Sequence, residues 1–392
     1  MNNEKYYITK QSLLLFVVCL FMPYIFASIA LAISITAFLT ESFMLKEIKF
    51  EKSHLVFSSL IMMFIANMLY FGFDSKVLEK LLRIVPILFF PILFFNVQLN
   101  SKELNRILDF FLGSLIMFCV FSIGYVSINY WLTETREHLL TLEKTILVGQ
   151  VYISRVFEFH TPYLSFYLLT GCIICYHKAF RQKKYIYMFC LLLVFMLYFT
   201  GRTSLFLALL LFVLLLKSFF KSTKKAVILL TCIVFFIGYA CYNFPMLNEK
   251  TMRVFEKGFG VYQRYYYLEA AFIAVKENII LGLGLVNYQV ELSKFLPNGV
   301  IANTHNQYLE FFVSTGLFGL VTYLYLKFEI LKKAIVQRPR TLLIFIIFFS
   351  LAELTEALLY RQRGIMLFAF ITSLLFYSNL TEKKVYSYRN NV

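Results

Sequence analysis

Long uncharged apolar runs recur along this sequence, and they restrict its fold more than any other feature. A helix needs roughly 20 apolar residues to cross the hydrocarbon core of a bilayer. The composition agrees, because 60% of the residues are hydrophobic and 15% are charged, whereas soluble proteins have roughly 45–50% and about 25%. We therefore expect an all-α, polytopic membrane protein. The candidate spans are residues 53–73, 80–97, 107–131, 160–177, 185–200, 203–219, 226–244, 305–326, 341–358 and 364–379.

The N-terminal apolar run, residues 11–39, decides the topology of everything after it. It could form one long helix or two short helices separated at Pro23, and it is too long for a cleaved signal peptide. Two helices give twelve spans with both termini in the cytoplasm, where 23 Lys and Arg residues then lie, against 14 outside. Since cytoplasmic loops are enriched in Lys and Arg, we expect twelve spans.

This topology assigns the net charge of +16 to loops that orient the helices, so we expect no nucleic-acid partner. We expect residues 1–392 to form a single integral membrane domain. Two long segments lie outside the membrane, residues 132–159 and residues 245–304, and the second of these precedes the tenth helix.

Several charged or titratable residues gather on the outer face. Arginine on the outer face is unexpected, because Lys and Arg are enriched in cytoplasmic loops. Charged residues at such positions are rare and usually functional. Any one of them could instead be an interface arginine that reaches the head groups. Several on one face predict a cavity suited to phosphate or pyrophosphate, which guanidinium groups bind in a planar, bidentate way. The residues are His160, Arg202, Arg264, His305, Arg361 and Arg363.

One stretch, NTHNQYLEFFVSTGLFGL, changes from polar to apolar within a few residues. Asn303 or Thr304 can cap a helix that His305 begins, and Tyr308 lies on the same helix face as His305. In the first turn, the positive end of the helix dipole favours a neutral imidazole, which can accept a proton. His305 is therefore a candidate general base, although a histidine that only hydrogen-bonds across an interface fits the spacing as well.

Other motifs are weaker. Cys172 and Cys175 have the spacing of a metal site but lack a second pair and a polar shell, so we interpret them as helix-face cysteines. Gly282 and Gly284 lack the third glycine of a dinucleotide site and predict a turn. We expect no ATP hydrolysis, because the sequence has no Walker motif.

The stretch THNQYLEFFVSTGLFGL resembles the signature of the O-antigen ligase and O-antigen polymerase superfamily. In that family a histidine-asparagine pair, here His305 and Asn306, opens a helix that ends in a G-x-x-G-L pattern. The stretch TGRTSLFLALL resembles the family's short arginine segment. RYYYLEAAFIAVKENIILGLGLVNY resembles its periplasmic Arg-x-x-x-aromatic segment. The resemblance covers about residues 150–380.

Two positions depart from the family pattern. Thr203 and Ser204 follow Arg202 where Gly or Ala is commoner, and Ile279 and Ile280 replace the usual proline before LGLG. Neither departure affects the charged residues.

The resemblance implies a C-type membrane glycosyltransferase in the bacterial inner membrane, with a periplasmic active site. It implies a glycan donor on undecaprenyl pyrophosphate, an acceptor that is lipid A-core or a growing glycan, and no metal and no nucleotide cofactor. Arg202, Arg264 and Arg361 or Arg363 would stabilise the pyrophosphate leaving group in place of a metal. His305 would deprotonate the acceptor hydroxyl, and the displacement would invert the anomeric carbon.

Asn306 and Tyr308 would support this site, and His160 or the neighbouring Glu158 is the alternative base. Three functions remain open: an O-antigen ligase, a polymerase of O-antigen or capsule repeat units, and a non-catalytic transporter of the lipid-linked glycan. The modest outer loops favour the ligase. The transporter is disfavoured, because the polar residues crowd one face and no inverted repeat is evident.

Overall fold

All secondary structure in the described part of the chain is helical, which agrees with the all-α prediction. The computed structural model describes residues 5–73, 75–133, 153–199, 202–219, 261–296, 303–337 and 340–378. The span expected at 226–244, most of the first outer loop and parts of the second lie outside these residues. The described helices that are long and apolar enough to cross a membrane are those at Tyr24–Leu45, Lys52–Phe71, Ser101–Ile128 and Gln307–Gln337.

These four helices support a membrane protein, and the total of twelve spans stays a prediction. The chain divides into two units, one made of residues 1–115 and 268–392 and the other of residues 116–267. Each unit is described by itself below.

In the unit of residues 116–267, helix α7 is packed on all sides. Nearly every side chain of α7 (Thr161–Ala179) is buried, as expected for a helix that is apolar all round. It contacts both α8 (Lys184–Phe199) and α9 (Arg202–Phe219). Two further helices, α5 (Ser101–Thr133) and α12 (Val261–Val275), each belong partly to this unit and partly to the other.

In the other unit, the N-terminal apolar run forms two helices, α1 (Tyr7–Cys19) and α2 (Tyr24–Leu45), as the twelve-span topology requires. Pro23 immediately precedes α2. Its missing N–H is not needed there, because the N–H groups at the start of a helix have no intrahelical acceptor. The start of α1 and the end of α2 lie together, because Nζ of Lys5 is 3.1 Å from Oε2 of Glu47. This is the end of the unit that the charge pattern assigns to the cytoplasm.

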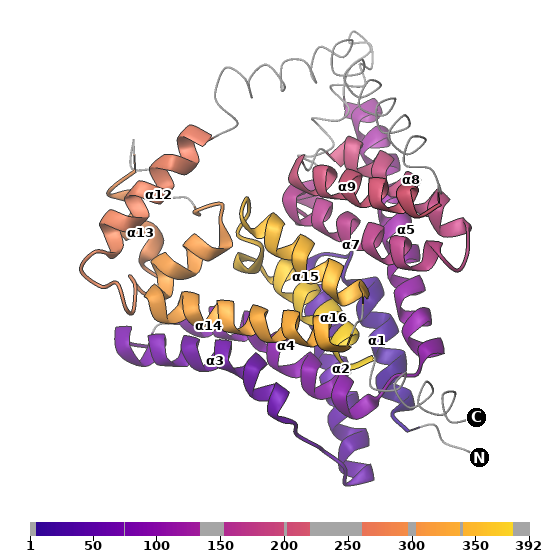
Figure 1. Ribbon diagram of the computed structural model, residues 1–392, viewed down its shortest axis with the longest axis horizontal. Helices are drawn as coiled ribbons and strands as arrows, with labels where there is room; N and C mark the ends of the chain where they lie inside the picture. The colour runs from indigo at the N-terminus through magenta and orange to yellow at the C-terminus, as the bar shows by residue number, and fades with distance from the viewer. Residues whose placement is uncertain are drawn as a thin grey trace. The chain divides into compact units, whose positions relative to one another are not determined.

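The remaining helices of this unit form its core and carry the candidate site. α14 (Gln307–Gln337) lies along α3 (Lys52–Phe71) and contacts α15 (Arg340–Glu353), as Figure 1 shows. The last helix, α16 (Gln362–Ser378), packs against α4 (Ser75–Val97).

Phenylalanine rings fill the centre of the unit. The ring of Phe16 on α1 has centroid distances of 5.1 Å to Phe90 on α4 and 5.3 Å to Phe370 on α16. Two short elements complete the unit, α13 (Tyr288–Ser293) and the 3-10 turn η3 (Leu358–Tyr360), which joins α15 to α16.

Candidate active site

The helix expected to begin at His305 begins two residues later, at Gln307. Oδ1 of Asn306 accepts hydrogen bonds from the backbone amides of Tyr308 (2.9 Å) and Leu309 (3.0 Å). Asn306 is therefore the residue that caps α14. This result corrects the expectation that an earlier residue caps the helix, and it gives the asparagine of the His-Asn pair a definite structural role.

His305 lies in the turn ahead of the helix and has a φ angle of 49°. For a residue with a β-carbon, this left-handed conformation costs roughly 1–2 kcal/mol. Such backbone strain clusters at functional sites. Because the dipole effect falls off beyond the terminal turn, the immediate surroundings of the ring matter more than the helix dipole.

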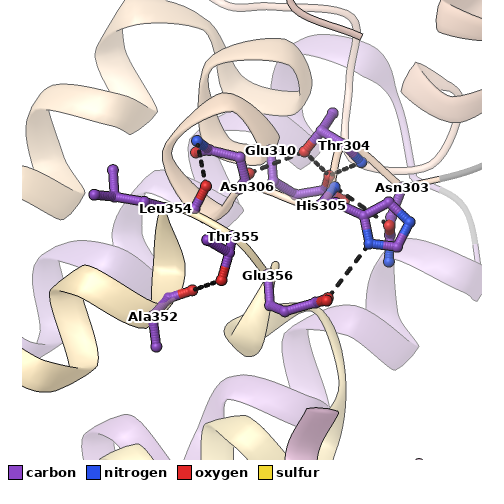
Figure 2. A network of polar contacts seen from close by, with 9 residues as sticks. All are labelled: Asn303, Thr304, His305, Asn306, Glu310, Ala352, Leu354, Thr355 and Glu356. Carbon is purple, nitrogen blue, oxygen red and sulfur yellow. Dashed lines mark hydrogen bonds and ion pairs between the residues drawn. The ribbon is translucent and has the colours of Figure 1, made fainter. Parts of the chain in front are cut away.

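A carboxylate faces the His305 ring. Nδ1 of His305 lies 3.3 Å from Oε2 of Glu356, and the two side chains are 44% and 31% exposed. Glu356 comes from the segment between α15 and η3, which runs beside the turn of His305 (Figure 2). A carboxylate at Nδ1 favours the tautomer that has the proton on that nitrogen, so Nε2 becomes the proton acceptor.

Two further hydrogen bonds join these segments. Nδ2 of Asn306 donates to the backbone oxygen of Leu354 (3.2 Å; Figure 2). The backbone amide of Leu359 donates to Oε1 of Gln307 (2.6 Å), which is buried. The position of Glu356 relative to His305 is thus fixed from both sides.

Behind the turn lies a buried carboxylate, Glu310. Its Oε2 accepts hydrogen bonds from the hydroxyl (2.7 Å) and backbone amide (3.2 Å) of Thr304, and its Oε1 accepts one from the hydroxyl of Tyr288. Burial raises the pKa of the Tyr288 phenol, and the adjacent Glu310 carboxylate raises it further. Thr304, which was an expected cap, thus ties the turn of His305 to α14 instead.

A cavity of about 50 Å³ opens beside Glu310. This volume is large enough to hold water molecules. Its polar lining residues are Lys80, Arg83, Tyr288, Gln307, Glu310, Ser314 and Tyr360.

A second buried carboxylate anchors α15 to α14. Glu353 is fully buried and forms an ion pair with Lys327, and it also accepts a hydrogen bond from the hydroxyl of Tyr323. Nζ of Lys327 lies 2.9 Å from Oγ of Ser350. The hydroxyl of Tyr308, which was expected to support the site, donates to the backbone oxygen of Ser350 (3.2 Å). Because Glu356 follows Glu353, the last residue of α15, by three positions, this network also fixes the segment that carries Glu356.

The two C-terminal arginines have different surroundings. Arg363 is buried, and its guanidinium donates to the backbone oxygens of Leu20 (3.0 Å) and Met22 (2.9 Å) at the junction of α1 and α2. Arg361 is exposed and follows η3, two residues after the Leu359 amide that binds Gln307. Arg363 thus binds the protein's own backbone, and a ligand-binding role for either arginine stays a prediction.

The other candidate residues belong to the second unit. His160 precedes α7, with Nδ1 3.2 Å from Oγ of Ser154, and Glu158 has a φ angle of 52°. Arg202 is the first residue of α9, and Arg264 lies in the first turn of α12. Their contribution to a site with His305 remains a prediction.

Three carboxylates of the site, Glu310, Glu353 and Glu356, were not predicted from the sequence. The pattern that located the other charged residues was that of Lys and Arg, which set membrane orientation. Acidic residues within or beside apolar runs are also costly and usually functional, and that rule could have identified all three. Among the described residues, no group of three or more His, Cys, Asp or Glu side chains gathers to form a metal site.

A comparison with protein families matches residues 188–324 to the family described as O-antigen ligase. A search of curated proteins finds no match to this chain. The matched segment extends from α8 into α14 and includes Arg202, Arg264 and His305. Residues 188–324 thus carry an O-antigen ligase domain, which supports the expected relation to the O-antigen ligase and polymerase superfamily.

Proposed function

We propose that this protein transfers a glycan from undecaprenyl pyrophosphate to an acceptor hydroxyl, as an O-antigen ligase that acts on lipid A-core. The observation that carries the proposal is the contact between His305 and Glu356 at the start of α14, within a chain that has the ligase domain. A paired imidazole and carboxylate form a general base whose tautomer is defined.

In the proposed reaction, Nε2 of His305 takes the proton of the acceptor hydroxyl while the hydroxyl oxygen attacks the anomeric carbon. The bond from that carbon to the pyrophosphate oxygen breaks, and the anomeric carbon is inverted. Glu356 holds the ring and stabilises the imidazolium that forms, as a carboxylate does beside a catalytic histidine. Asn306 orients the turn through its cap and its bond to Leu354.

The leaving group is a pyrophosphate, and its developing charge needs stabilisation. We assign this task to Arg202, Arg264 and Arg361, because guanidinium groups bind phosphate oxygens in a bidentate way. Arg363 is left out of the set, since two backbone oxygens already occupy its guanidinium. No step of this mechanism requires a metal ion.

We further propose that the protein lies in the bacterial inner membrane, with both termini in the cytoplasm and the site in the periplasm. The alternating charge of the loops supports this orientation. Labelling from the periplasm tests it: a membrane-impermeant maleimide should react with a cysteine that replaces Asn298 and not with one that replaces Gln182. The reverse labelling pattern would place the site on the wrong side.

The decisive functional experiment is deletion of the gene, followed by gel analysis of the lipopolysaccharide. Loss of a ligase leaves bare core, while polymer accumulates on the carrier lipid. Core that carries a single repeat unit would instead identify a polymerase, which uses the same chemistry on a different acceptor. Unchanged lipopolysaccharide together with lost capsule would identify a capsule polymerase.

A further inference from the structure

Helix α14 is interrupted at Gly316, where φ is 68° and ψ is −164°. An interruption of this kind leaves backbone groups of the helix without their usual partners. A distant segment, residues 279–283, supplies them. The amides of Leu317 and Phe318 donate to the backbone oxygens of Ile279 (2.8 Å) and Ile280 (3.1 Å). In the other direction, the amide of Leu283 donates to the oxygen of Val313 (2.9 Å).

The approach of this segment is so close that only glycine fits on both sides. A β-carbon added to Gly316 would lie 2.3 Å from the backbone oxygen of Ile280, and one added to Gly282 would lie 2.4 Å from the backbone nitrogen of Gly316. Both residues also have positive φ angles. The segment is therefore docked tightly on α14 around Gly316. Its depth in the membrane is set by the depth of that part of the helix.

That depth is in the middle of the apolar part of α14. The helix has no charged residue from Phe311 to Leu326, and Leu317 and Phe318 lie at the centre of this stretch. They follow the first helical residue by about ten positions, which is roughly 15 Å at 1.5 Å per residue. This is about half of the roughly 30 Å that the hydrocarbon core measures.

Two side chains of the segment are exposed at this depth. Ile279 is 52% exposed and Ile280 is 65% exposed, beside Leu317 and Phe318, which are 48% and 47% exposed. The four side chains form one apolar patch, which we name the isoleucine patch. Backbone groups at membrane depth must be paired within the protein. The carbonyls of Ile279 and Ile280 meet this condition through α14.

We propose that residues 279–283 form a re-entrant segment of the membrane, with the isoleucine patch in contact with phospholipid acyl chains of the outer leaflet. The segment falls within residues 245–304, which the topology prediction assigns wholly to the periplasm, so this part of that loop returns into the bilayer. The proposal requires α14 to span the membrane and does not depend on the proposed reaction.

Tryptophan fluorescence tests the proposal on the intact protein, because the chain contains a single tryptophan, Trp131. In a Trp131→Phe background, the test variant is Ile280→Trp. The matched control is Val290→Trp on α13, because Val290 is also exposed (50%). Leu317→Trp on α14 provides the value for a lipid-facing position. The proteins are reconstituted into phosphatidylcholine vesicles with or without brominated acyl chains, and iodide serves as the aqueous quencher.

Bromine quenches tryptophan fluorescence only on contact. We therefore expect brominated lipid to quench Ile280→Trp as strongly as Leu317→Trp, as for a residue in the hydrocarbon core. The quenching of Ile280→Trp should be about twofold or more stronger than that of Val290→Trp. Iodide should show the opposite order. The proposal would be overturned if iodide quenched Ile280→Trp as strongly as Val290→Trp and brominated lipid did not quench Ile280→Trp. Ile279→Trp gives an independent second probe if Ile280→Trp does not fold. Strong iodide quenching of Leu317→Trp would show instead that α14 itself is outside the membrane.

Discussion

Nδ1 of His305 lies 3.3 Å from the Glu356 carboxylate, although 51 positions separate the two residues in the sequence. The contact depends on two structures: the Asn306 cap, which fixes the start of α14, and the buried Lys327–Glu353 pair, which fixes the end of α15.

His305→Ala should abolish transfer and leave donor binding nearly intact, because the imidazole acts on the acceptor and the arginines act on the donor. General-base catalysis typically contributes about 10²–10⁴-fold in rate. Transfer and binding of the undecaprenyl-linked donor should be measured on the same sample in nanodiscs. A loss of transfer of no more than about tenfold is smaller than a general base contributes. That result would exclude His305 as the base and direct attention to His160 or Glu158. Loss of donor binding as well would place the histidine in the pyrophosphate site.

Glu356→Gln should lower kcat by about tenfold to a hundredfold and change KM little, since the carboxylate positions the imidazole and does not bind substrate. The effect is smaller than for a buried catalytic carboxylate, because both side chains are partly exposed and solvent screens the pair. Glu291→Gln is the control, as Glu291 forms an exposed ion pair with Lys294 (2.6 Å). Equal rates for both variants would remove Glu356 from the mechanism.

Arg202→Lys and Arg264→Lys should each lower the rate by about a hundredfold although the charge is kept. An ammonium cannot reproduce a bidentate contact with pyrophosphate, and a lost contact of this kind costs about 3 kcal/mol in the transition state. Arg340→Lys at the start of α15 serves as the control for a general effect of the substitution. If both variants retain full activity, these arginines are membrane-interface anchors and the donor site lies elsewhere.

Arg363→Ala should destabilise the protein by about 3 kcal/mol, because the backbone oxygens of Leu20 and Met22 lose their charged donor in a buried position. Arg361→Ala should leave stability unchanged and reduce transfer. A thiol-reactive dye can follow thermal unfolding, since Cys119, Cys172 and Cys175 are buried in the folded protein. An unchanged unfolding temperature for Arg363→Ala, combined with lost activity, would return Arg363 to the pyrophosphate site.

Gly316→Ala should lower the unfolding temperature strongly. Its β-carbon would meet the Ile280 backbone, and its φ and ψ angles suit only glycine, which together cost about 3 kcal/mol or more. Gly113→Ala is the matched control, because it lies inside α5 with no atom within 4 Å of the added carbon. There, alanine should be neutral or should stabilise by up to about 1 kcal/mol. Equal stability of the two variants would mean that the 279–283 segment does not dock on α14.

The sequence by itself determined the class of the protein and the division of its N-terminal run at Pro23 into α1 and α2. Hydropathy acts on the segment in which it occurs, so a local pattern suffices for the class. The division at Pro23 followed from the Lys and Arg count over all the loops, which is also a property of the sequence alone. The sequence also identified His305 and Asn306 as a pair, because these residues are adjacent and belong to a family motif that residues 188–324 carry.

The tertiary structure alone decided which residues meet. Glu356 reaches His305 across 51 positions, Arg363 binds the α1–α2 junction more than 340 positions away, and Gly282 docks on Gly316. These contacts depend on how separate helices pack, and packing geometry has no periodic trace in the residues involved. The proposed preference for Arg361 over Arg363, which the sequence left open, has the same origin, because the two arginines are alike in sequence and differ in which neighbours the fold brings to them.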